Sequence, residues 1–317
     1  MTKPPILLTG KIPSSIVARL EEVGEIDQFR RDGVDVMPRD ELIARIAGKQ
    51  ALVSMITDSI DREVIEAASG LKVIANAAVG YNNIDVAAAR ERGIVVTNTP
   101  GVLTDATADL TWALILGITR RIGEGERLIR RGEWRGWTFD FMLGAEIRGK
   151  QLGIVGYGGI GRGVAARGRA FGMRVAYTSR TPKDDPDAQP MPFDRLLATS
   201  DVVSLHCPLT PETRHLIDQP ALARMKRSAY LINTSRGPVV DEKALAWALR
   251  TRLIAGAALD VFEHEPKVEP ELLTLENVLL VPHLGSGTVE TRTAMANLAV
   301  RNVAAVLSGQ RPLTPVP

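Results

Sequence analysis

Nearly from end to end, the chain alternates between short apolar runs rich in β-branched residues and amphipathic segments. Buried parallel strands have this composition, and the amphipathic segment between two such runs is typical of a crossover helix. The runs, in chain order, are ILLTG, ALVSMI, KVIANAA, IVVTNT, QLGIVG, RVAYTS, DVVSLHC, AYLINTS, IAGAALDV and NVLLVPH. The pattern predicts an α/β fold with two Rossmann-like or flavodoxin-like parallel-sheet domains.

Two helical patterns indicate how the domains are connected. LTDATADLTWALILGITRRI lies between the two blocks of strands, and GTVETRTAMANLAVRNVAAVLSG follows the last strand. Both have apolar residues at helical spacing. We expect the second of these helices to return to the first block, so that the second block is an insertion. The predicted domains are residues 1–99 with 286–317, and residues 100–285.

Composition excludes several classes of protein. Hydrophobic residues make up 45% of the chain, charged residues 24%, and the formal net charge is +2, so no broad field attracts nucleic acid or an anionic membrane. A single cysteine, Cys207, permits no intrachain disulfide and fits a reducing compartment. No apolar stretch is long enough to span a bilayer. We expect a cytoplasmic protein with no metal site and no nucleic-acid or membrane partner.

A glycine pattern in IVGYGGIGRG predicts a nucleotide site. Gly156, Gly158 and Gly161 form G-x-G-x-x-G between an expected strand and an expected helix. The first glycine permits the tight turn, the second lets backbone approach a diphosphate, and the third lets helix and strand pack closely. The helix N-terminus then faces the diphosphate. The alternative is a tight turn that binds no ligand.

The next strand, in VAYTSRTPK, indicates which coenzyme binds. An Asp or Glu at its end would accept hydrogen bonds from a ribose 2′-hydroxyl and repel a 2′-phosphate. This chain instead has Thr178, Ser179 and Arg180 there. A hydroxyl and a guanidinium suit a phosphate, so we predict NADP(H), with NAD(H) used less well. In the alternative interpretation Arg180 stacks on adenine and is compatible with either coenzyme.

Three charged residues at three strand ends are the catalytic candidates. His283 ends NVLLVPH, where ligands bind in open α/β sheets, and histidine is the usual general acid near neutral pH. Arg236 follows AYLINTS, and Glu265 follows IAGAALDV. Glu265 beside His283 would stabilise the imidazolium. The alternative for Arg236 and Glu265 is a structural salt bridge between them.

These segments resemble the D-isomer-specific 2-hydroxyacid dehydrogenases, and most of all their glyoxylate/hydroxypyruvate reductase branch. The resemblance implies a substrate domain, a Rossmann domain and a homodimer. It implies that Arg236, Glu265 and His283 are catalytic, and that the backbone of Val79 and Gly80 binds the substrate carboxylate, which Arg236 and His283 also contact. The segments that carry it are NAAVGYNNID, VTNTPGVLTDATADL, IRGKQLGIVGYGGIGRG, INTSRGPVVDEKAL, ALDVFEHEP and VPHLGS.

The expected coenzyme contacts lie in the glycine turn and at the ends of the following strands. They are Thr104, Gly156, Tyr157, Gly158, Gly159, Ile160, Gly161, Ser179, Arg180, Thr181, Cys207, Pro208, Thr234, Ser235, Asp260 and Gly285. The aromatic residues Trp134, Trp137 and Phe139 must bury their surface, either on their own domain or on a second copy of the protein, and we favour the second. Residues 122–148, which contain them, look like the dimerisation arm of the family. Phe141 is expected to reach the neighbouring active site.

The expected function is NADPH-preferring reduction of small 2-oxo acids to D-2-hydroxy acids. Glyoxylate and hydroxypyruvate are the first candidates, with 2-ketogluconate a further one. In this mechanism Arg236 binds the carboxylate and polarises the carbonyl, while His283 donates a proton to the developing alkoxide. The alternatives are another D-2-hydroxyacid dehydrogenase of the family, or a non-catalytic NAD(P)-sensing corepressor on the same fold.

Overall fold

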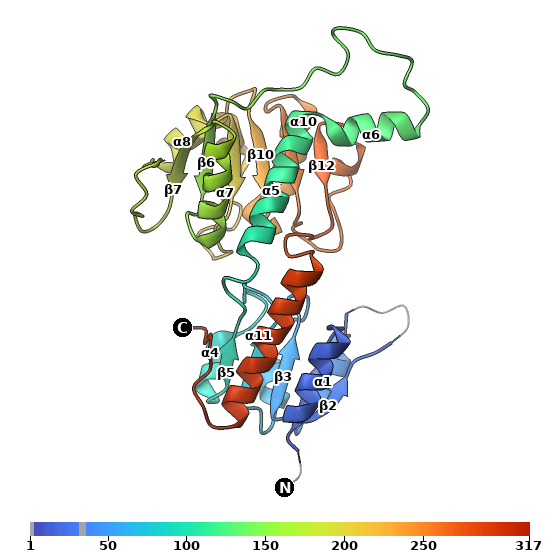
Figure 1. Ribbon diagram of the computed structural model, residues 1–317, viewed down its shortest axis with the longest axis vertical. Helices are drawn as coiled ribbons and strands as arrows, with labels where there is room; N and C mark the ends of the chain where they lie inside the picture. The colour runs from blue at the N-terminus through green and yellow to red at the C-terminus, as the bar shows by residue number, and fades with distance from the viewer. Residues whose placement is uncertain (1–2, 32–35) are drawn as a thin grey trace. The chain divides into compact units, whose positions relative to one another are not determined.

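The computed structural model describes residues 3–31 and 36–317 and divides the chain into two compact units. The first unit consists of Met1–Leu103 and Gly287–Pro317, and the second is Thr104–Ser286. In Figure 1 the blue-to-cyan N-terminal part and the red C-terminal helix accordingly belong to the same unit. The first crossing lies at Leu103, whereas the sequence pattern placed it at residue 99.

The first unit is a parallel sheet with the strand order β2-β1-β3-β4-β5. Helices α1 and α11 cover one face of this sheet, and α2, α3 and α4 cover the other. The strands are β1 (Pro5–Leu8), β2 (Glu25–Gln28), β3 (Ala51–Ser54), β4 (Val73–Asn76) and β5 (Val95–Thr97). The helices are α1 (Ser14–Val23), α2 (Arg39–Ile46), α3 (Arg62–Ala67), α4 (Val86–Glu91) and α11 (Val289–Leu307).

The second unit is a parallel sheet with the order β12-β11-β10-β9-β6-β7-β8. Its strands are β6 (Gln151–Val155), β7 (Arg174–Thr178), β8 (Ala188–Pro190), β9 (Val202–Leu205), β10 (Tyr230–Asn233), β11 (Gly256–Leu259) and β12 (Val278–Leu280). Helices α5 (Thr104–Thr119) and α7 (Gly159–Ala170) pack on one face, and α8 (Phe193–Thr199), α9 (Gln219–Arg224) and α10 (Glu242–Arg250) on the other. Two 3₁₀ turns complete this unit, η1 (Gly237–Val239) and η2 (Leu272–Thr274).

The predicted fold class is confirmed, and the strands have continuous apolar sequences because both faces of each sheet are covered. Leu231 and Ile232 are neighbours in β10, yet they enter the two cores on opposite faces of the sheet. Both are fully buried, and burying one such side chain contributes about 1.5–3 kcal/mol. The sequence pattern missed β2 and β8, two edge strands whose sequences, EIDQ and AQP, lack an apolar run.

The segment predicted as a dimerisation arm begins with α6 (Ile122–Arg130). Residues 131–150 then contain neither helix nor strand and run as a long exposed loop (Figure 1). Its aromatic side chains are exposed, Trp137 by 76% and Phe139 by 88%. Apolar surface on this scale is typical of an interaction site.

Candidate active site

The carboxyl ends of the parallel strands in the second unit lie at one edge of the sheet, where ligands bind in open α/β folds. The glycine turn follows β6, the segment with Arg180 follows β7, and Arg236 lies beyond the end of β10. The segments with Glu265 and His283 follow β11 and β12, which are adjacent in the sheet. Parallel pairing therefore brings residues that are far apart in the sequence to one edge.

The three glycines of the turn have different physical requirements. Gly156 has φ +95°, and a Cβ there would lie 2.5 Å from the backbone nitrogen of Cys207. A Cβ on Gly161 would lie 2.3 Å from the carbonyl oxygen of Gly156. A Cβ on Gly158 would meet nothing within 4 Å. The fold itself therefore requires Gly156 and Gly161, whereas at Gly158 the chain leaves open space.

The start of α7 can bind an anion. Gly158 is its N-cap residue, and no side chain caps this end of the helix. The N–H groups of the first turn are therefore available, and the helix dipole favours negative charge there. Together with the open space at Gly158, this arrangement fits the diphosphate of a dinucleotide coenzyme.

The segment after β7 carries the predicted phosphate ligands. Arg180 and Thr181 are exposed, and the Ser179 hydroxyl donates to the carbonyl oxygen of Thr181 at 2.6 Å. Hydrogen bonding by Thr210 holds the pKa of Glu212 below its ordinary value, and the charge of Arg180 lowers that pKa further. Arg180 is thus electrostatically coupled to the loop after β9.

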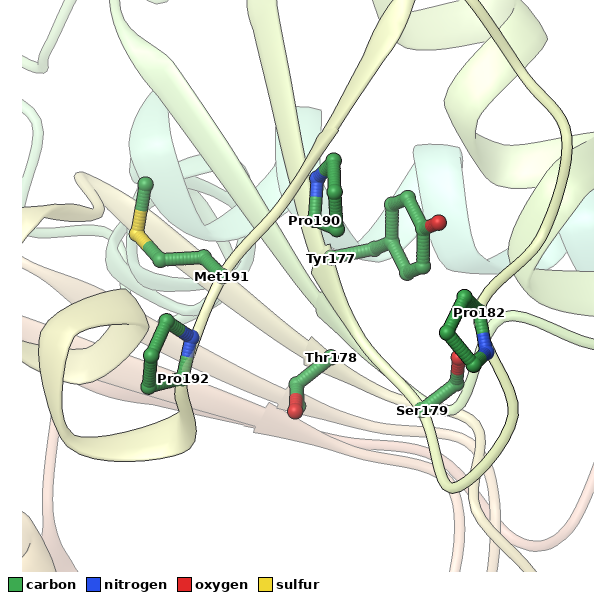
Figure 2. Close-up of a pocket in the computed structure, with 7 residues that line it drawn as sticks. All are labelled: Tyr177, Thr178, Ser179, Pro182, Pro190, Met191 and Pro192. Carbon is green, nitrogen blue, oxygen red and sulfur yellow. The ribbon is translucent and has the colours of Figure 1, made fainter.

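A cavity of about 250 Å³ lies behind this segment (Figure 2). Its walls come from the end of β7, the segment that follows it, and the turn between β8 and α8. The residues that line it are Tyr177, Thr178, Ser179, Pro182, Pro190, Met191 and Pro192. The side chain of Arg180 is not part of this lining.

Glu265 and His283 form a hydrogen-bonded pair. Oε2 of Glu265 lies 2.8 Å from Nδ1 of His283, and each side chain is 33% exposed. Oε1 of Glu265 accepts the N–H of Phe262 at 3.0 Å. Desolvation opposes ionisation of Glu265, but the hydrogen bond and charge of His283 outweigh it, so the pKa of Glu265 lies below its ordinary value. Nε2 of His283 remains directed away from the pair.

The backbone at His283 is strained and held in place. His283 has φ +53°, a left-handed conformation that is costly for a residue with a Cβ. Its N–H donates to the carbonyl oxygen of Asp260 at 2.9 Å. The buried carboxylate of Asp260 accepts the N–H of Leu284 and, at 2.8 Å, that of Gly285. Desolvation raises the pKa of Asp260, although these bonds favour its charged form.

A second buried carboxylate holds the segment that carries Glu265. Glu242, the first residue of α10, is 4% exposed. Its oxygens accept the N–H of Glu263 at 2.6 Å and that of Glu269 at 3.2 Å. These two residues flank Glu265 in the sequence. Buried carboxylates therefore restrain the backbone on both sides of the pair, Glu242 beside Glu265 and Asp260 beside His283.

Arg236 lies beyond the end of β10 and directly precedes η1. One of its N–H groups donates to the carbonyl oxygen of Ser235 at 2.7 Å, and its own carbonyl oxygen accepts from Asn233 at 3.0 Å. Desolvation lowers the pKa of Arg236, while the charge of Glu265 acts in the opposite direction. Arg236 is thus electrostatically coupled to the carboxylate that binds His283.

The other histidines do not share this environment. Burial lowers the pKa of His206 to about 3, so its ring is neutral near pH 7. His206 contacts Ser204 at 2.8 Å, and its buried Nδ1 has no hydrogen-bond partner among the residues that the structure describes. His264 is exposed. His215 lies 2.6 Å from Glu263, a pair that sequence reasoning missed.

Three of the remaining predicted coenzyme contacts carry hydroxyl groups, one at the start of α5 and two after β10. Thr104 begins α5 and lies beside Gly159, since a Cβ on Gly159 would come within 3.4 Å of its hydroxyl oxygen. Thr234 and Ser235 follow β10, and their hydroxyls contact the hydroxyl of Thr111 at 2.9 Å and Asn233 at 2.8 Å.

Two predicted contacts are largely enclosed by the protein. Burial raises the pKa of the Cys207 thiol to about 11. The ring of Tyr157 is 1% exposed and belongs to the core between the sheet and α7, so any coenzyme contact of Tyr157 would involve its backbone. Pro208 is exposed, and its carbonyl oxygen accepts from Thr213 at 2.7 Å.

In the first unit, two asparagines hold the segment predicted to bind a carboxylate. Nδ2 of Asn98 donates to the carbonyl oxygen of Val79 at 2.7 Å, and Nδ2 of Asn76 donates to that of Gly80 at 2.8 Å. Within residues 3–31 and 36–317, the N–H groups of Val79 and Gly80 donate to no acceptor. The N–H groups of Val79 and Gly80 are therefore available to an anion. The sequence analysis did not identify either asparagine as part of this site.

Two further observations concern the described part of the chain. It contains no group of three or more His, Cys, Asp or Glu side chains that could hold a metal ion. None of its helices combines the length and the apolar character needed to cross a membrane.

Comparison with known proteins identifies the family. Residues 112–285 match the NAD-binding domain of the D-isomer specific 2-hydroxyacid dehydrogenases. A glyoxylate reductase of Thermococcus litoralis is 47% identical over 318 residues, which cover 98% of this chain and 96% of that protein. The chain belongs to the D-isomer specific 2-hydroxyacid dehydrogenase family. The resemblance inferred from the sequence motifs, to this family and its glyoxylate reductase branch, is therefore confirmed.

Solved structures agree with this assignment. The TT0316 protein of Thermus thermophilus is 46% identical to this dehydrogenase, with a TM-score of 0.93 over 99% of this chain and 100% of that one. An NADPH-dependent glyoxylate/hydroxypyruvate reductase of Sinorhizobium meliloti, solved with NADP and malonate, is 36% identical, with a TM-score of 0.88 over 99% and 97% of the two chains. The dehydrogenase uses a nicotinamide coenzyme, and its reaction interconverts small 2-oxo acids and D-2-hydroxy acids.

Proposed function

We propose that this dehydrogenase is an NADPH-preferring reductase of glyoxylate and hydroxypyruvate, with 2-ketogluconate a further candidate substrate. The observation that carries the proposal is the Glu265–His283 pair at the same edge of the sheet as the glycine turn. The names of the relatives support the substrate class, because several curated relatives are glyoxylate reductases. One structural relative is described as NADPH-dependent.

The proposed chemistry divides into hydride and proton transfer. When bound, the coenzyme supplies the hydride that adds to C2 of the 2-oxo acid. His283 donates the proton to the oxygen on C2 through Nε2, because Nδ1 already faces Glu265 at 2.8 Å. Before this transfer the imidazole ring is protonated and positively charged, and Glu265 stabilises that charge. Arg236 binds the substrate carboxylate and polarises the carbonyl group, as a guanidinium does well.

The first unit supplies a second set of donors in this proposal. The N–H groups of Val79 and Gly80 bind the substrate carboxylate. Asn98 supports this role, because it binds the carbonyl oxygen of Val79, which shares a peptide group with the N–H of Gly80. The carbonyl oxygen of Ala78, which shares a peptide group with the N–H of Val79, accepts the N–H of Thr99 at 2.9 Å.

The proposed preference for NADPH rests on Arg180. Its guanidinium is exposed directly after β7, where an acidic residue would select NADH. In Arg180→Ala, KM for NADPH should rise much more than KM for NADH. Arg174→Ala is the matched control, because Arg174 is an exposed arginine at the opposite end of the same strand. Equal effects of Arg180→Ala on both coenzymes would remove the argument.

Residues 122–148 are proposed to form a homodimer interface through their exposed aromatic side chains. Phe141, 38% exposed, is proposed to contact the partner's active site. The proposal places the reaction in the cytoplasm.

The decisive assay measures turnover of glyoxylate, hydroxypyruvate, pyruvate and 2-ketogluconate with NADPH and with NADH. His283→Ala should lower kcat by about 10²–10⁴-fold, because it removes the general acid. His264→Ala, an exposed histidine nearby, should leave kcat unchanged. Absence of turnover with every acid would contradict the proposed function, and equal losses in the two variants would contradict the role of His283.

A further inference from the structure

We infer that coenzyme selectivity depends on two stacked tyrosines, Tyr157 and Tyr177, because they hold the β7 loop (residues 179–187) that carries Arg180. Neither tyrosine is required to touch the coenzyme 2′-phosphate in this arrangement. Their role is positioning. The inference rests on the proposed NADPH preference, and its test separates the two.

The tyrosine rings join two segments that are distant in the sequence. Tyr157 lies in the glycine turn after β6, and Tyr177 lies near the end of β7. Their ring centroids are 4.1 Å apart, the ring planes differ by 18°, and each residue is 1% exposed. Stacked and buried rings of this kind have little freedom to move. The pair therefore gives both hydroxyl groups a well-defined position at the base of the β7 loop.

Both hydroxyls bind the β7 loop. Tyr157 donates to Oδ2 of Asp185 at 2.6 Å. Tyr177 donates to the carbonyl oxygen of Lys183 at 2.9 Å and accepts the N–H of the same residue at 3.0 Å. Desolvation and the bond to Asp185 raise the pKa of Tyr157 to about 12, so its hydroxyl stays protonated near neutral pH. The bond from Tyr157 in turn lowers the pKa of Asp185, which stays ionised.

The first half of the β7 loop, from Ser179 to Pro182, is not held in place by close side-chain packing. The cavity of about 250 Å³ lies between Ser179 and Pro182 on one side and Pro190 and Met191 on the other (Figure 2). Side chains separated by such a space make few dispersion contacts. The hydrogen bonds from the tyrosines therefore restrain the conformation of the loop around Arg180, together with the bond from Ser179 to Thr181 and the 3.5 Å contact of Arg169 with Asp185.

A less restrained loop should bind NADP⁺ less well. Arg180 must be held in one place to bind a 2′-phosphate, and ordering a mobile loop on binding reduces the affinity. NAD⁺ has no 2′-phosphate, so it gains nothing from an ordered Arg180. Removing one hydrogen bond should therefore weaken NADP⁺ selectively, by about five-fold.

The test uses Tyr157→Phe and Tyr177→Phe, which remove the hydroxyls and keep the ring stack. Calorimetry should show that Kd for NADP⁺ rises about five-fold in each variant while Kd for NAD⁺ changes by less than about two-fold. Amide hydrogen exchange should become faster in the β7 loop, most of all at Lys183 in Tyr177→Phe. Asp185→Asn weakens the hydrogen bond with Tyr157 without changing either tyrosine. It should likewise raise Kd for NADP⁺ more than Kd for NAD⁺.

Tyr230→Phe is the matched control. Tyr230 is the first residue of β10, so it lies at the amino-terminal end of this strand, away from the carboxyl ends where the coenzyme is proposed to bind, and neither affinity should change. Equal losses of NADP⁺ and NAD⁺ affinity in the tyrosine variants would overturn the inference, because the tyrosines would then support the glycine turn in general. An unchanged affinity ratio would overturn it too.

Arg180→Ala separates the inference from the coenzyme proposal. If Arg180→Ala weakens NADP⁺ selectively and the tyrosine variants do not, only the inference fails. If Arg180→Ala weakens both nucleotides equally, the proposed preference fails, and the inference fails with it.

Discussion

Gly158 and Gly161 lie in the same turn, yet replacing each by alanine should have opposite consequences. At Gly161 the new Cβ would stand 2.3 Å from the carbonyl oxygen of Gly156, and both atoms are tied to backbone. At Gly158 it would meet nothing within 4 Å, and the backbone there has φ −83° and ψ −158°, which alanine adopts readily. The fold requires Gly161, whereas in the proposed coenzyme site the ligand requires Gly158.

The expected magnitudes follow from these contacts. Relief of the clash at Gly161 requires helix and strand to move apart, which costs about 1–3 kcal/mol and lowers Tm by about 2–12 °C. For Gly158→Ala, the lower entropy of the unfolded chain stabilises the fold by about 0.4–1 kcal/mol, and the poorer helix cap offsets it by a similar amount. Tm should therefore change by less than about 2 °C. A methyl group against the diphosphate should instead raise Kd for NADP⁺ by about 5- to 150-fold.

Differential scanning fluorimetry and calorimetry with NADP⁺ measure the two effects separately. Gly125→Ala in α6 is the control, because its Cβ would make an ordinary 3.6 Å contact with Met142. This control should retain the Kd of the unaltered protein. If Gly158→Ala binds NADP⁺ with the Kd of the unaltered protein, the diphosphate does not approach that residue closely, and this argument is refuted. An unchanged Tm in Gly161→Ala would refute the packing argument.

Three further predictions concern the Glu265–His283 pair and the predicted dimerisation arm. The pKa of Glu265 lies below its ordinary value of 4.5, so ionised Glu265 stabilises the fold above that pH and loses this effect as the pH falls through the lowered pKa. The Tm advantage over Glu265→Gln should be full at a pH above the ordinary pKa and should vanish once the pH falls below the lowered pKa. The pH profile of reduction should move to lower pH. A pH-independent Tm difference or a fixed profile would contradict this role. Glu242→Gln leaves a buried N–H without its acceptor, so Tm should fall by about 2–12 °C and kcat with it; unchanged values of both would exclude the positioning role. Trp137→Ser with Phe139→Ser should convert a dimer to a monomer in light scattering, and an unchanged mass would exclude this arm as the interface.

The main elements of the fold could be predicted from the sequence. Strands buried on both faces, such as β6 and β10, have apolar sequences whatever their neighbours are, so periodicity reveals them. Two of the four edge strands, β2 and β8, were missed, because they gain their conformation from pairing with one neighbour and lack an apolar run.

The candidate site shows the same division. The Glu265–His283 contact could be anticipated because each residue follows a strand, and β11 and β12 are consecutive along the chain. The roles of Glu242 and Asn98 could not be anticipated. Each acts through a hydrogen bond to a backbone group elsewhere in the chain, 21 residues away for Glu242 and 19 for Asn98.

The sequence alone therefore determined most of the strands and the glycine turn, and it supplied the candidate catalytic side chains, because local composition reports burial and chemistry. Only the tertiary structure decided which carboxylates hold the pair in place and which tyrosines hold the β7 loop. A hydrogen bond between distant segments depends on strand order and on the geometry of the connecting loops, and no local pattern of residues records either of them.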